Sequence, residues 1–268
     1  MHVKARPEDM GEFAIVAGDP DRLPMIVERF DGGMEASHHV TSSRGYGVYT
    51  GTIDGTRVSA VAHGIGCPSA AIVLEELAQL GVKTVIRVGT CGGLQPYVRP
   101  GDVIVSTACV RDEGTSRQYL PLEVPATAHM GVVLSAVEAA ADAGLTLGAH
   151  EKGDASQTPH ALAGMTHCKD SFYSELEGST AVEEINAGRW ASWKAAGVLA
   201  TEMEASALYV VGGLRGMRTG VVLAVVGSTG DESADFFASP EVMSAARDRA
   251  IEVTVGAMRR LIRTERAS

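Results

Sequence analysis

Strand-like and helix-like segments are mixed along the whole of this chain, and that mixture leaves few folds open. Short apolar runs of strand length lie at residues 13–17, 47–53, 57–62, 84–88, 102–110, 146–152 and 220–226. Helical patterns cover residues 23–30, 68–80, 130–143, 182–196, 205–214 and 240–263. Strands interspersed with helices of this length indicate an α/β fold, in which helices cover a sheet in layers.

One pair of runs predicts a β-hairpin. Residues 46–53 and 56–63 are joined by Asp54-Gly55, a dipeptide typical of tight two-residue turns. An antiparallel pair among strands that are otherwise separated by helices predicts a mixed sheet. The 268 residues contain no repeat and no stretch of linker composition, and 45% of them are hydrophobic. We therefore expect a single domain over residues 1–268, built as a three-layer α/β/α sandwich around a mixed central β-sheet.

The overall charge and the cysteines narrow the classes of partner. A formal net charge of −10 disfavours nucleic acid, because duplex binding needs a basic face. Cys67, Cys91, Cys109 and Cys168 lack the paired spacing of metal ligands and fit reduced thiols of a cytosolic protein. The N-terminus has no apolar signal core, and no run approaches the roughly 20 apolar residues of a membrane helix. We expect a soluble, cytoplasmic protein that binds neither nucleic acid nor a membrane.

An arginine interrupts the apolar run at residues 84–88. Arg87 is followed by a glycine-rich stretch, Gly89-Thr90-Cys91-Gly92-Gly93, that we interpret as a turn. A guanidinium on an apolar strand is costly to bury unless a negative group meets it. Glycines let the backbone approach such a group closely, and the Thr90 hydroxyl can add a contact. The partner is either an internal carboxylate or a bound anion.

A second strand end repeats this arrangement and favours the anion. Residues 15–22 read Ile-Val-Ala-Gly-Asp-Pro-Asp-Arg, so that Gly18 ends a strand and Arg22 stands where the following helix begins. Free backbone N–H groups at a helix N-terminus favour a negative ligand. Neither a Walker loop nor a convincing dinucleotide fingerprint is present. Arg22 alone is equally well a solvated charge, but two such strand ends together indicate phosphate.

Several further motifs complete a pattern that extends over nearly the whole chain. They are Gly18-Asp19-Pro20-Asp21-Arg22, Ser43-Arg44-Gly45, His63-Gly64-Ile65-Gly66-Cys67-Pro68-Ser69, Arg87-Val88-Gly89-Thr90-Cys91-Gly92, Gly101-Asp102-Val103, Pro121-Leu122-Glu123-Val124-Pro125-Ala126, Asp170-Ser171-Phe172-Tyr173 and Glu202-Met203-Glu204-Ala205. In this order they resemble the nucleoside phosphorylase family, specifically its hexameric branch of uridine and purine phosphorylases.

The resemblance implies phosphorolysis, in which orthophosphate attacks C1′ of a nucleoside and displaces the base. It assigns the phosphate to Gly18, Arg22, Arg87 and Thr90, with Arg44 lent by the neighbouring subunit. Arg87 is thereby a candidate catalytic residue, and inorganic phosphate is a co-substrate in an enzyme without a cofactor. Taken without the resemblance, Arg44 reads as a solvated loop arginine.

The resemblance also assigns the ribose. Glu204 would accept hydrogen bonds from the 2′- and 3′-hydroxyls and act as a second catalytic residue, Met203 would pack on the sugar, and His2 would reach across a dimer to the 5′-hydroxyl. From the residues alone, Glu204 reads as a helix cap and His2 as a disordered chain end. Because Arg44 and His2 would complete a neighbour's site, we expect a homo-oligomer, a hexamer built from dimers. We expect no metal, since Gly45 stands where the family's uridine enzymes hold a monovalent cation with a glutamate.

The base site departs from the family pattern. Phe172 is expected to stack on the base, but the glutamine and arginine with which uridine phosphorylases read uracil are missing after Tyr173. Glu175 stands nearby and is either an acceptor for a base N–H or a solvated loop carboxylate. Ser228 replaces the aspartate that protonates the leaving purine in bacterial purine phosphorylases. Residues 230–237 form either a flap over the base or the entry to the last helix.

Together these features lead us to expect a pentosyltransferase of nucleotide salvage that converts uridine and phosphate to uracil and ribose 1-phosphate. A purine nucleoside phosphorylase that uses Glu175 or Asp231 on the base is the first alternative. A non-catalytic nucleoside-binding protein is the second. A nucleosidase that uses water is disfavoured by the three arginines Arg22, Arg44 and Arg87.

Overall fold

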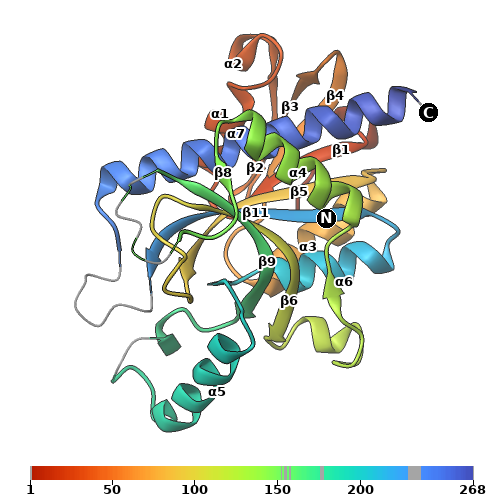
Figure 1. The fold of residues 1–268 in the computed structure, drawn as a ribbon. Helices are drawn as coiled ribbons and strands as arrows, with labels where there is room; N and C mark the ends of the chain where they lie inside the picture. Colours follow the sequence, from red (N-terminus) through yellow and green to blue (C-terminus); the bar gives the residue numbers. More distant parts are fainter. Residues whose placement is uncertain are drawn as a thin grey trace.

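The computed structural model describes residues 2–151, 153, 156, 158–175, 178–228 and 237–267. Their strands form one sheet in the order β10-β9-β6-β11-β5-β1-β4-β3-β2, with β7 and β8 pairing at its side (Figure 1). The strands are β1 (Phe13–Ala17), β2 (His38–Ser43), β3 (Tyr46–Ile53), β4 (Thr56–Ala62), β5 (Thr84–Gly93), β6 (Val103–Asp112), β7 (Ala126–Thr127), β8 (Thr146–Leu147), β9 (His160–Lys169), β10 (Ala200–Glu202) and β11 (Arg218–Ser228). Most neighbouring strands in it are parallel, whereas β6 pairs antiparallel with β11 and the β4-β3-β2 edge is antiparallel, so the sheet is mixed as predicted.

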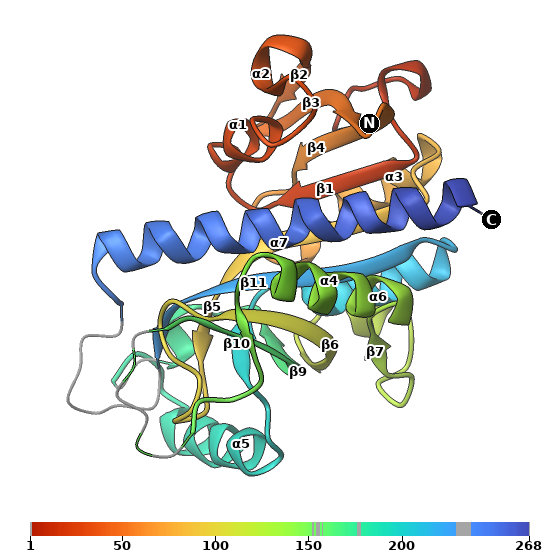
Figure 2. The same ribbon diagram turned by 45° about the horizontal axis from the view of Figure 1, so that its top comes forward.

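Helices cover both faces of the sheet, which gives the expected three layers (Figure 2). The α-helices are α1 (Arg22–Val27), α2 (Gly33–Ala36), α3 (Cys67–Gln79), α4 (Met130–Asp142), α5 (Glu183–Ala195), α6 (Ala205–Leu214) and α7 (Pro240–Ala267), and the short 3₁₀ helices are η1 (Pro7–Asp9), η2 (Ser116–Gln118) and η3 (Tyr173–Glu175). One core lies between the sheet and α3 and α6, and the other lies between the sheet and α1, α4 and α7.

Alternation along the central strands produces these two cores. In β1, Val16 faces the α3 and α6 side while Ile15 faces the α7 side. In β5, Val85 and Ile86 divide in the same way, and all four side chains are essentially buried. A strand buried on both faces has no polar side, which is why these segments read as continuous apolar runs. Arg87 is the exception on such a strand.

The sheet curls back on itself at one end. Strand β10 pairs in parallel with β9 and antiparallel with Gly92 and Gly93 of β5, so β5, β11, β6, β9 and β10 form a closed ring. Residues 89–93 are therefore the end of β5, and the prediction of a turn there is wrong. Pairing with β10 and with the end of β11 holds this glycine-rich stretch extended.

Other predicted elements agree with the structure to within a few residues. Strands β3 and β4 form the predicted hairpin, and Asp54 and Gly55 both have positive φ, at 49° and 70°, as a tight hairpin turn requires. The strand predicted at residues 146–152 ends at Leu147. Strands β2, β7, β9 and β10 were not predicted. Within the described part of the chain, the helices are too short or too polar to span a lipid bilayer.

Candidate active site

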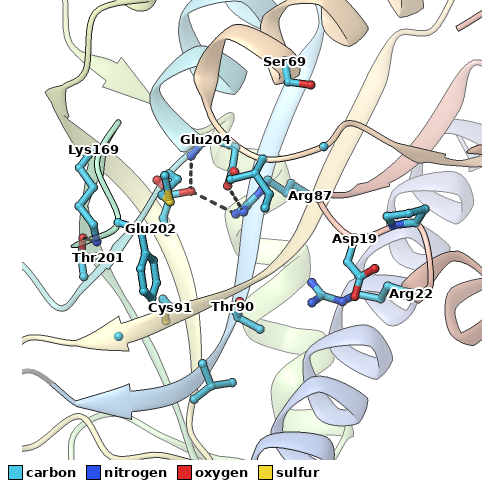
Figure 3. Close-up of a pocket in the computed structure, with 18 of the residues that line it drawn as sticks. Asp19, Arg22, Ser69, Arg87, Thr90, Cys91, Lys169, Thr201, Glu202 and Glu204 are labelled. Atoms are coloured by element: carbon cyan, nitrogen blue, oxygen red, sulfur yellow. Dashed lines mark hydrogen bonds and ion pairs between the residues drawn. The ribbon is translucent and has the colours of Figure 1, made fainter. Parts of the chain in front are cut away.

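A cavity of about 900 Å³ opens beside the carboxyl ends of the parallel strands β1, β5 and β11 (Figure 3). Parallel strands of α/β folds bind ligands at that edge, because the loops leaving the strands converge there. Most of the residues predicted from the sequence line this cavity. They are Gly18, Arg22, Arg44, Arg87, Thr90, Phe172, Met203 and Glu204. The segments that carry them lie as far apart in the chain as Gly18 and Glu204, and the fold brings them to one place.

Arg87 is buried at the centre of the cavity wall and is paired with two carboxylates. Its Nη2 donates a hydrogen bond to Glu204 Oε2, and its Nη1 lies 3.1 Å from Glu202 Oε2. The second contact is an ion pair without hydrogen-bond alignment. Among the described residues, Nη1 has no hydrogen-bonded acceptor although it is buried. An oxyanion in the cavity would satisfy such a donor. The internal carboxylate partners predicted for Arg87 are therefore present, and the bound anion stays a prediction that its place in the cavity wall allows.

The two glutamates at the start of α6 have different contacts. Glu202 Oε2 accepts hydrogen bonds from the backbone N–H of Glu204 at 2.8 Å and of Ala205 at 2.9 Å, so Glu202 caps the helix. Glu204 makes no side-chain cap bond. Its carboxylate instead accepts from Gly66 N at 2.6 Å and from Arg87. Glu204 is thereby left at the cavity wall, as a ligand for hydroxyl groups would be.

Arg22 begins α1, as the sequence predicts, and is buried with its Nη1 donating to the carbonyl of Val88 at 3.2 Å. Burial lowers the pKa of Arg22 to about 10, and repulsion by the Arg87 guanidinium adds to the effect. A bound anion would relieve both penalties, because it offsets the desolvation and screens the two cations from each other. The cavity thus has one end suited to an oxyanion.

The glycine at the end of β1 allows a close approach between strand ends. A Cβ on Gly18 would lie 3.1 Å from the carbonyl oxygen of Gly64 and 3.6 Å from the His63 ring. His63 itself is fully enclosed beside Arg87, whose Nε donates to His63 Nε2 at 3.3 Å. Burial lowers the pKa of His63 to about 3, and the neighbouring Arg87 charge contributes. His63 is therefore neutral at physiological pH, with its proton on Nδ1 so that Nε2 can accept.

The far end of the cavity is aromatic. Phe172 and Phe237 lie with their rings nearly parallel, at an interplanar angle of 8° and a centroid distance of 6.4 Å, and Tyr173 packs edge-on against Phe172. All three line the cavity. Flat apolar walls of this kind suit a heterocyclic ring. Phe172 therefore lies in the cavity wall, and its stacking on a base stays a prediction.

Three residues predicted for the site are not enclosed in the cavity of their own chain or are not described by the structure. His2 does not line this cavity; its backbone N and ring both contact the Glu76 carboxylate, with Nδ1 at 2.8 Å from Oε1. Arg44 is exposed at the rim of its own chain's cavity, at the turn between β2 and β3, with a φ of 55°. The Glu175 side chain lies outside the described residues, as do Asp231 and most of the proposed flap at residues 230–237.

Sequence reasoning assigned no role in the site to three charged residues of the cavity wall, Asp19, Lys169 and Glu202. Glu202 was passed over because one of two glutamates that flank Met203 had to be the cap, and the sequence alone does not say which. Lys169 was missed because β9 was not recognised as a strand, so its last residue was not placed at the ligand edge. Cys91 lines the cavity as well, and burial raises the pKa of its thiol.

A metal site is not apparent in the described residues, where no group of three or more His, Cys, Asp or Glu side chains could hold an ion. The polar side chains that line the cavity are three guanidiniums, three carboxylates, a lysine and hydroxyls. Such a set can bind an oxyanion at one end and hydroxyl groups in the middle.

Comparison with known proteins gives consistent matches. Residues 12–259 match the family model of the phosphorylase superfamily. The chain is 40% identical to the uridine phosphorylase of Treponema pallidum, over 85% of this chain and 81% of that protein. It is 34% identical to the uridine phosphorylase of Escherichia coli, over 93% and 92% of the two chains. It is also 32% identical to the guanosine phosphorylase of Halorubrum lacusprofundi, over 96% and 97%.

A solved structure agrees in fold. The crystal structure of uridine phosphorylase from Vibrio fischeri, complexed with 6-hydroxy-1-naphthoic acid, matches with a TM-score of 0.78 and 28% sequence identity. The match covers 96% of this chain and 95% of that one.

Proposed function

This chain belongs to the phosphorylase superfamily, and from that premise we propose that it is a uridine phosphorylase. The reaction converts uridine and orthophosphate into uracil and ribose 1-phosphate, and the enzyme is a pentosyltransferase. The observation that carries the proposal is the order of groups along one cavity. Arg22 and Lys169 lie on opposite sides of Arg87 and Glu204 (Figure 3), and the Phe172 ring lies beside Lys169, with its centroid 5.8 Å from Nζ. That order matches phosphate, ribose and base.

The cationic end accounts for phosphate binding. Arg22, Arg87 and Thr90 would hold orthophosphate, with Gly18 leaving room for the backbone to approach it. Charge-assisted hydrogen bonds of this kind contribute about 1.5–3 kcal/mol each. The phosphate stands beneath C1′, and it meets the positive charge that develops on the sugar as the glycosidic bond breaks.

The middle of the cavity would hold the sugar. Glu204 is fixed by Gly66 N and Arg87, and its carboxylate can accept hydrogen bonds from the 2′- and 3′-hydroxyls. Met203 lines the cavity next to it and packs on the sugar ring. Arg87 contacts both Glu204 and the phosphate in this scheme, so it sets the distance between nucleophile and sugar. Holding the two reactants in register removes much of the entropic barrier to the displacement.

The oligomeric state is part of the same proposal. Arg44 and His2 serve a neighbouring subunit's site, and the working form is a hexamer built from dimers. The exposure of Arg44 at the rim and the partial exposure of His2 beside Tyr46 support this assignment, because a second chain can reach both residues. We further propose that the whole chain acts as one domain in cytoplasmic nucleotide salvage, with no cofactor and no metal.

A nucleoside panel assayed with and without phosphate tests the proposal. Uridine should release uracil only when phosphate is present. Release of hypoxanthine or guanine instead identifies a purine nucleoside phosphorylase, the alternative favoured by the similarity to the guanosine phosphorylase. Binding of nucleosides without turnover identifies a non-catalytic binding protein. Release of base that does not depend on phosphate contradicts the proposal, since it points to attack by water.

A further inference from the structure

A buried lysine stands at the aromatic end of the cavity. Lys169 is the last residue of β9, it lines the cavity, and only 4% of its surface is exposed. Lysine is rarely buried to this degree, because removing an ammonium group from water is costly. A buried lysine in a ligand cavity is therefore a candidate for a specific role. Neither the phosphate site nor the ribose site described above uses it.

A chain of hydrogen bonds fixes the position of this lysine. Lys169 Nζ donates to Thr201 Oγ1 at 2.9 Å, and Thr201 Oγ1 lies 2.9 Å from His167 Nδ1. His167 Nε2 in turn lies 3.2 Å from Asp112 Oδ2. Burial lowers the pKa of His167, so the imidazole is neutral. One assignment of hydrogens then satisfies the whole chain: the Thr201 hydroxyl donates to Nδ1, and Nε2–H donates to Asp112.

Aromatic packing holds this chain of hydrogen bonds in place. The His167 ring is fully buried and stacks on Trp193 of α5, with centroids 3.9 Å apart, while Trp190 packs against its edge at 4.8 Å. Trp190 also lies under the Lys169 ammonium, 5.6 Å from Nζ to the ring centroid. Because the supporting side chains are themselves fixed by packing, the ammonium is positioned in advance of any ligand.

The ammonium is at the base end of the cavity and not at the phosphate end. Nζ lies 5.8 Å from the centroid of the Phe172 ring, which is the proposed stacking surface for the base. In Figure 3, Lys169 and Arg22 stand on opposite sides of the pair formed by Arg87 and Glu204. A ligand that spans the cavity would therefore meet a guanidinium at one end and the ammonium at the other.

We propose that Lys169 donates a hydrogen bond to a carbonyl oxygen of the uracil ring and stabilises its negative charge as it leaves. The inference rests on the proposed function. When the C1′–N1 bond breaks, its electron pair stays on N1 and spreads onto the ring carbonyls, while a phosphate oxygen forms the new bond to C1′. Solvent later protonates the uracil anion. An ammonium has three N–H donors, so Lys169 can keep its bond to Thr201 while it donates to the base.

The same contact explains how a base is read without the glutamine and arginine that the sequence lacks. A cation that only donates favours rings with a carbonyl at that position, such as uracil and thymine. When that carbonyl is O4, the ammonium disfavours cytosine, which carries a donating amino group at C4 instead, because two donors then face each other. Lys169 thus contributes to base selection as well as to catalysis.

Lys169→Met tests the proposal, because methionine keeps most of the length and removes the charge. Lys83→Met is the matched control: Lys83 is exposed and pairs with Glu12 on the surface. Both variants and the unmodified enzyme are assayed with uridine and with 5-fluorouridine, whose fluorine already stabilises the leaving anion. For Lys169→Met we expect kcat/KM with uridine to fall about 10- to 150-fold. With 5-fluorouridine the fall should be several-fold smaller, while KM for phosphate stays unchanged.

A purely structural lysine would give a different result. Equal losses with the two substrates, or no loss with either, overturn the proposal. Thr201→Val keeps the lysine but removes its hydrogen-bonded support, and we expect the same substrate-dependent pattern at a smaller magnitude. Thermal unfolding of each variant checks that it folds, and calorimetric binding of free uracil in the presence of phosphate tests the contact without turnover. Unchanged uracil binding in Lys169→Met would also overturn it.

The same assays distinguish failure of the proposed function from failure of the role of Lys169. In that case the unmodified enzyme neither releases uracil from uridine nor binds free uracil, and the role of Lys169 falls with it. If the unmodified enzyme is active on uridine and Lys169→Met matches the Lys83→Met control, only the role of Lys169 is wrong.

Discussion

His63 should make the folded protein sensitive to mild acid, and His63→Gln should remove that sensitivity. The imidazole is fully enclosed beside Arg87, and burial together with that charge lowers its pKa to about 3. In the unfolded chain the same group titrates near its ordinary value of about 6.5. Between these two values the unfolded state binds a proton that the folded state does not. Stability is therefore complete above pH 6.5 and decreases as the pH falls toward 3.

The size of the effect follows from the two pKa values. Each pH unit inside the window removes about 1.4 kcal/mol from the free energy of unfolding. Between pH 7 and pH 5 the loss attributable to His63 is about 2 kcal/mol, since the titration of the unfolded state is only partial near pH 6.5. Glutamine is neutral throughout and can still accept from Arg87 Nε, so His63→Gln keeps the contact and removes the proton linkage.

Urea unfolding at pH 7 and pH 5 measures this loss. Carboxylates elsewhere also titrate, so the quantity to compare is the pH-dependent change in the unmodified protein minus the change in His63→Gln, at one protein concentration. The expected difference is about 2 kcal/mol. His38→Gln, at an exposed position on β2, is the control and should behave as the unmodified protein does. If His63→Gln loses as much stability as the unmodified protein, the enclosed neutral imidazole is not there.

Three further perturbations test other parts of the site and the fold. Glu202→Gln removes the charge that caps α6 and pairs with Arg87. It should lower the free energy of unfolding, measured by urea denaturation, by about 1.5–3 kcal/mol. A change near zero would show that Glu202 does not cap the helix. Arg22→Gln should raise KM for phosphate about 10- to 150-fold and change KM for uridine far less in steady-state kinetics. The reverse result would show that the phosphate does not bind at Arg22. Gly11→Ala should destabilise the folded protein by about 1–3 kcal/mol in thermal or urea unfolding, because the added Cβ would overlap the carbonyl of Arg57. Gly213→Ala is the control, since Gly213 lies in open space on α6 and its substitution should not destabilise the protein. Equal effects of the two substitutions would contradict the packing described for Gly11.

Local sequence patterns predicted most of the elements because those elements follow their own periodicity. Strand β1 and the β3–β4 hairpin came from apolar runs and a turn dipeptide, and the bounds of α3 and α4 agree to within one residue. The failures have a common cause. Strand β9 is rich in alanine, glycine and histidine, which have little strand preference, and it is held by pairing with β6 and β10. Strand β10 has three residues, too few to show any period.

The glycine-rich end of β5 shows why such patterns mislead. Residues 89–93 have the composition of a turn, and only the non-local pairing with β10 and β11 keeps them extended. Tertiary contacts override weak local preference at such places. The closed ring of five strands could not be predicted for the same reason, since it depends on β10 meeting two strands far away in the sequence.

Residues of the cavity could be predicted where they lie at a strand end that the sequence reveals. Arg22 and Arg87 were found because a charged side chain beside glycines at a strand end is unusual enough to need a reason. Lys169 ends a strand that the sequence does not reveal, and Glu202 differs from Glu204 only in where its carboxylate points. Residues that depend on non-local geometry for their role leave no local signal.

The central claim is that an oxygen of orthophosphate attacks C1′ of uridine in this cavity. Phosphate carrying heavy oxygen in all four positions, incubated with uridine and the enzyme in ordinary water, tests it by mass spectrometry of the products. We predict ribose 1-phosphate that retains all four heavy oxygens, formed together with uracil. Free ribose with oxygen from water, or no phosphorylated sugar at all, would contradict the account.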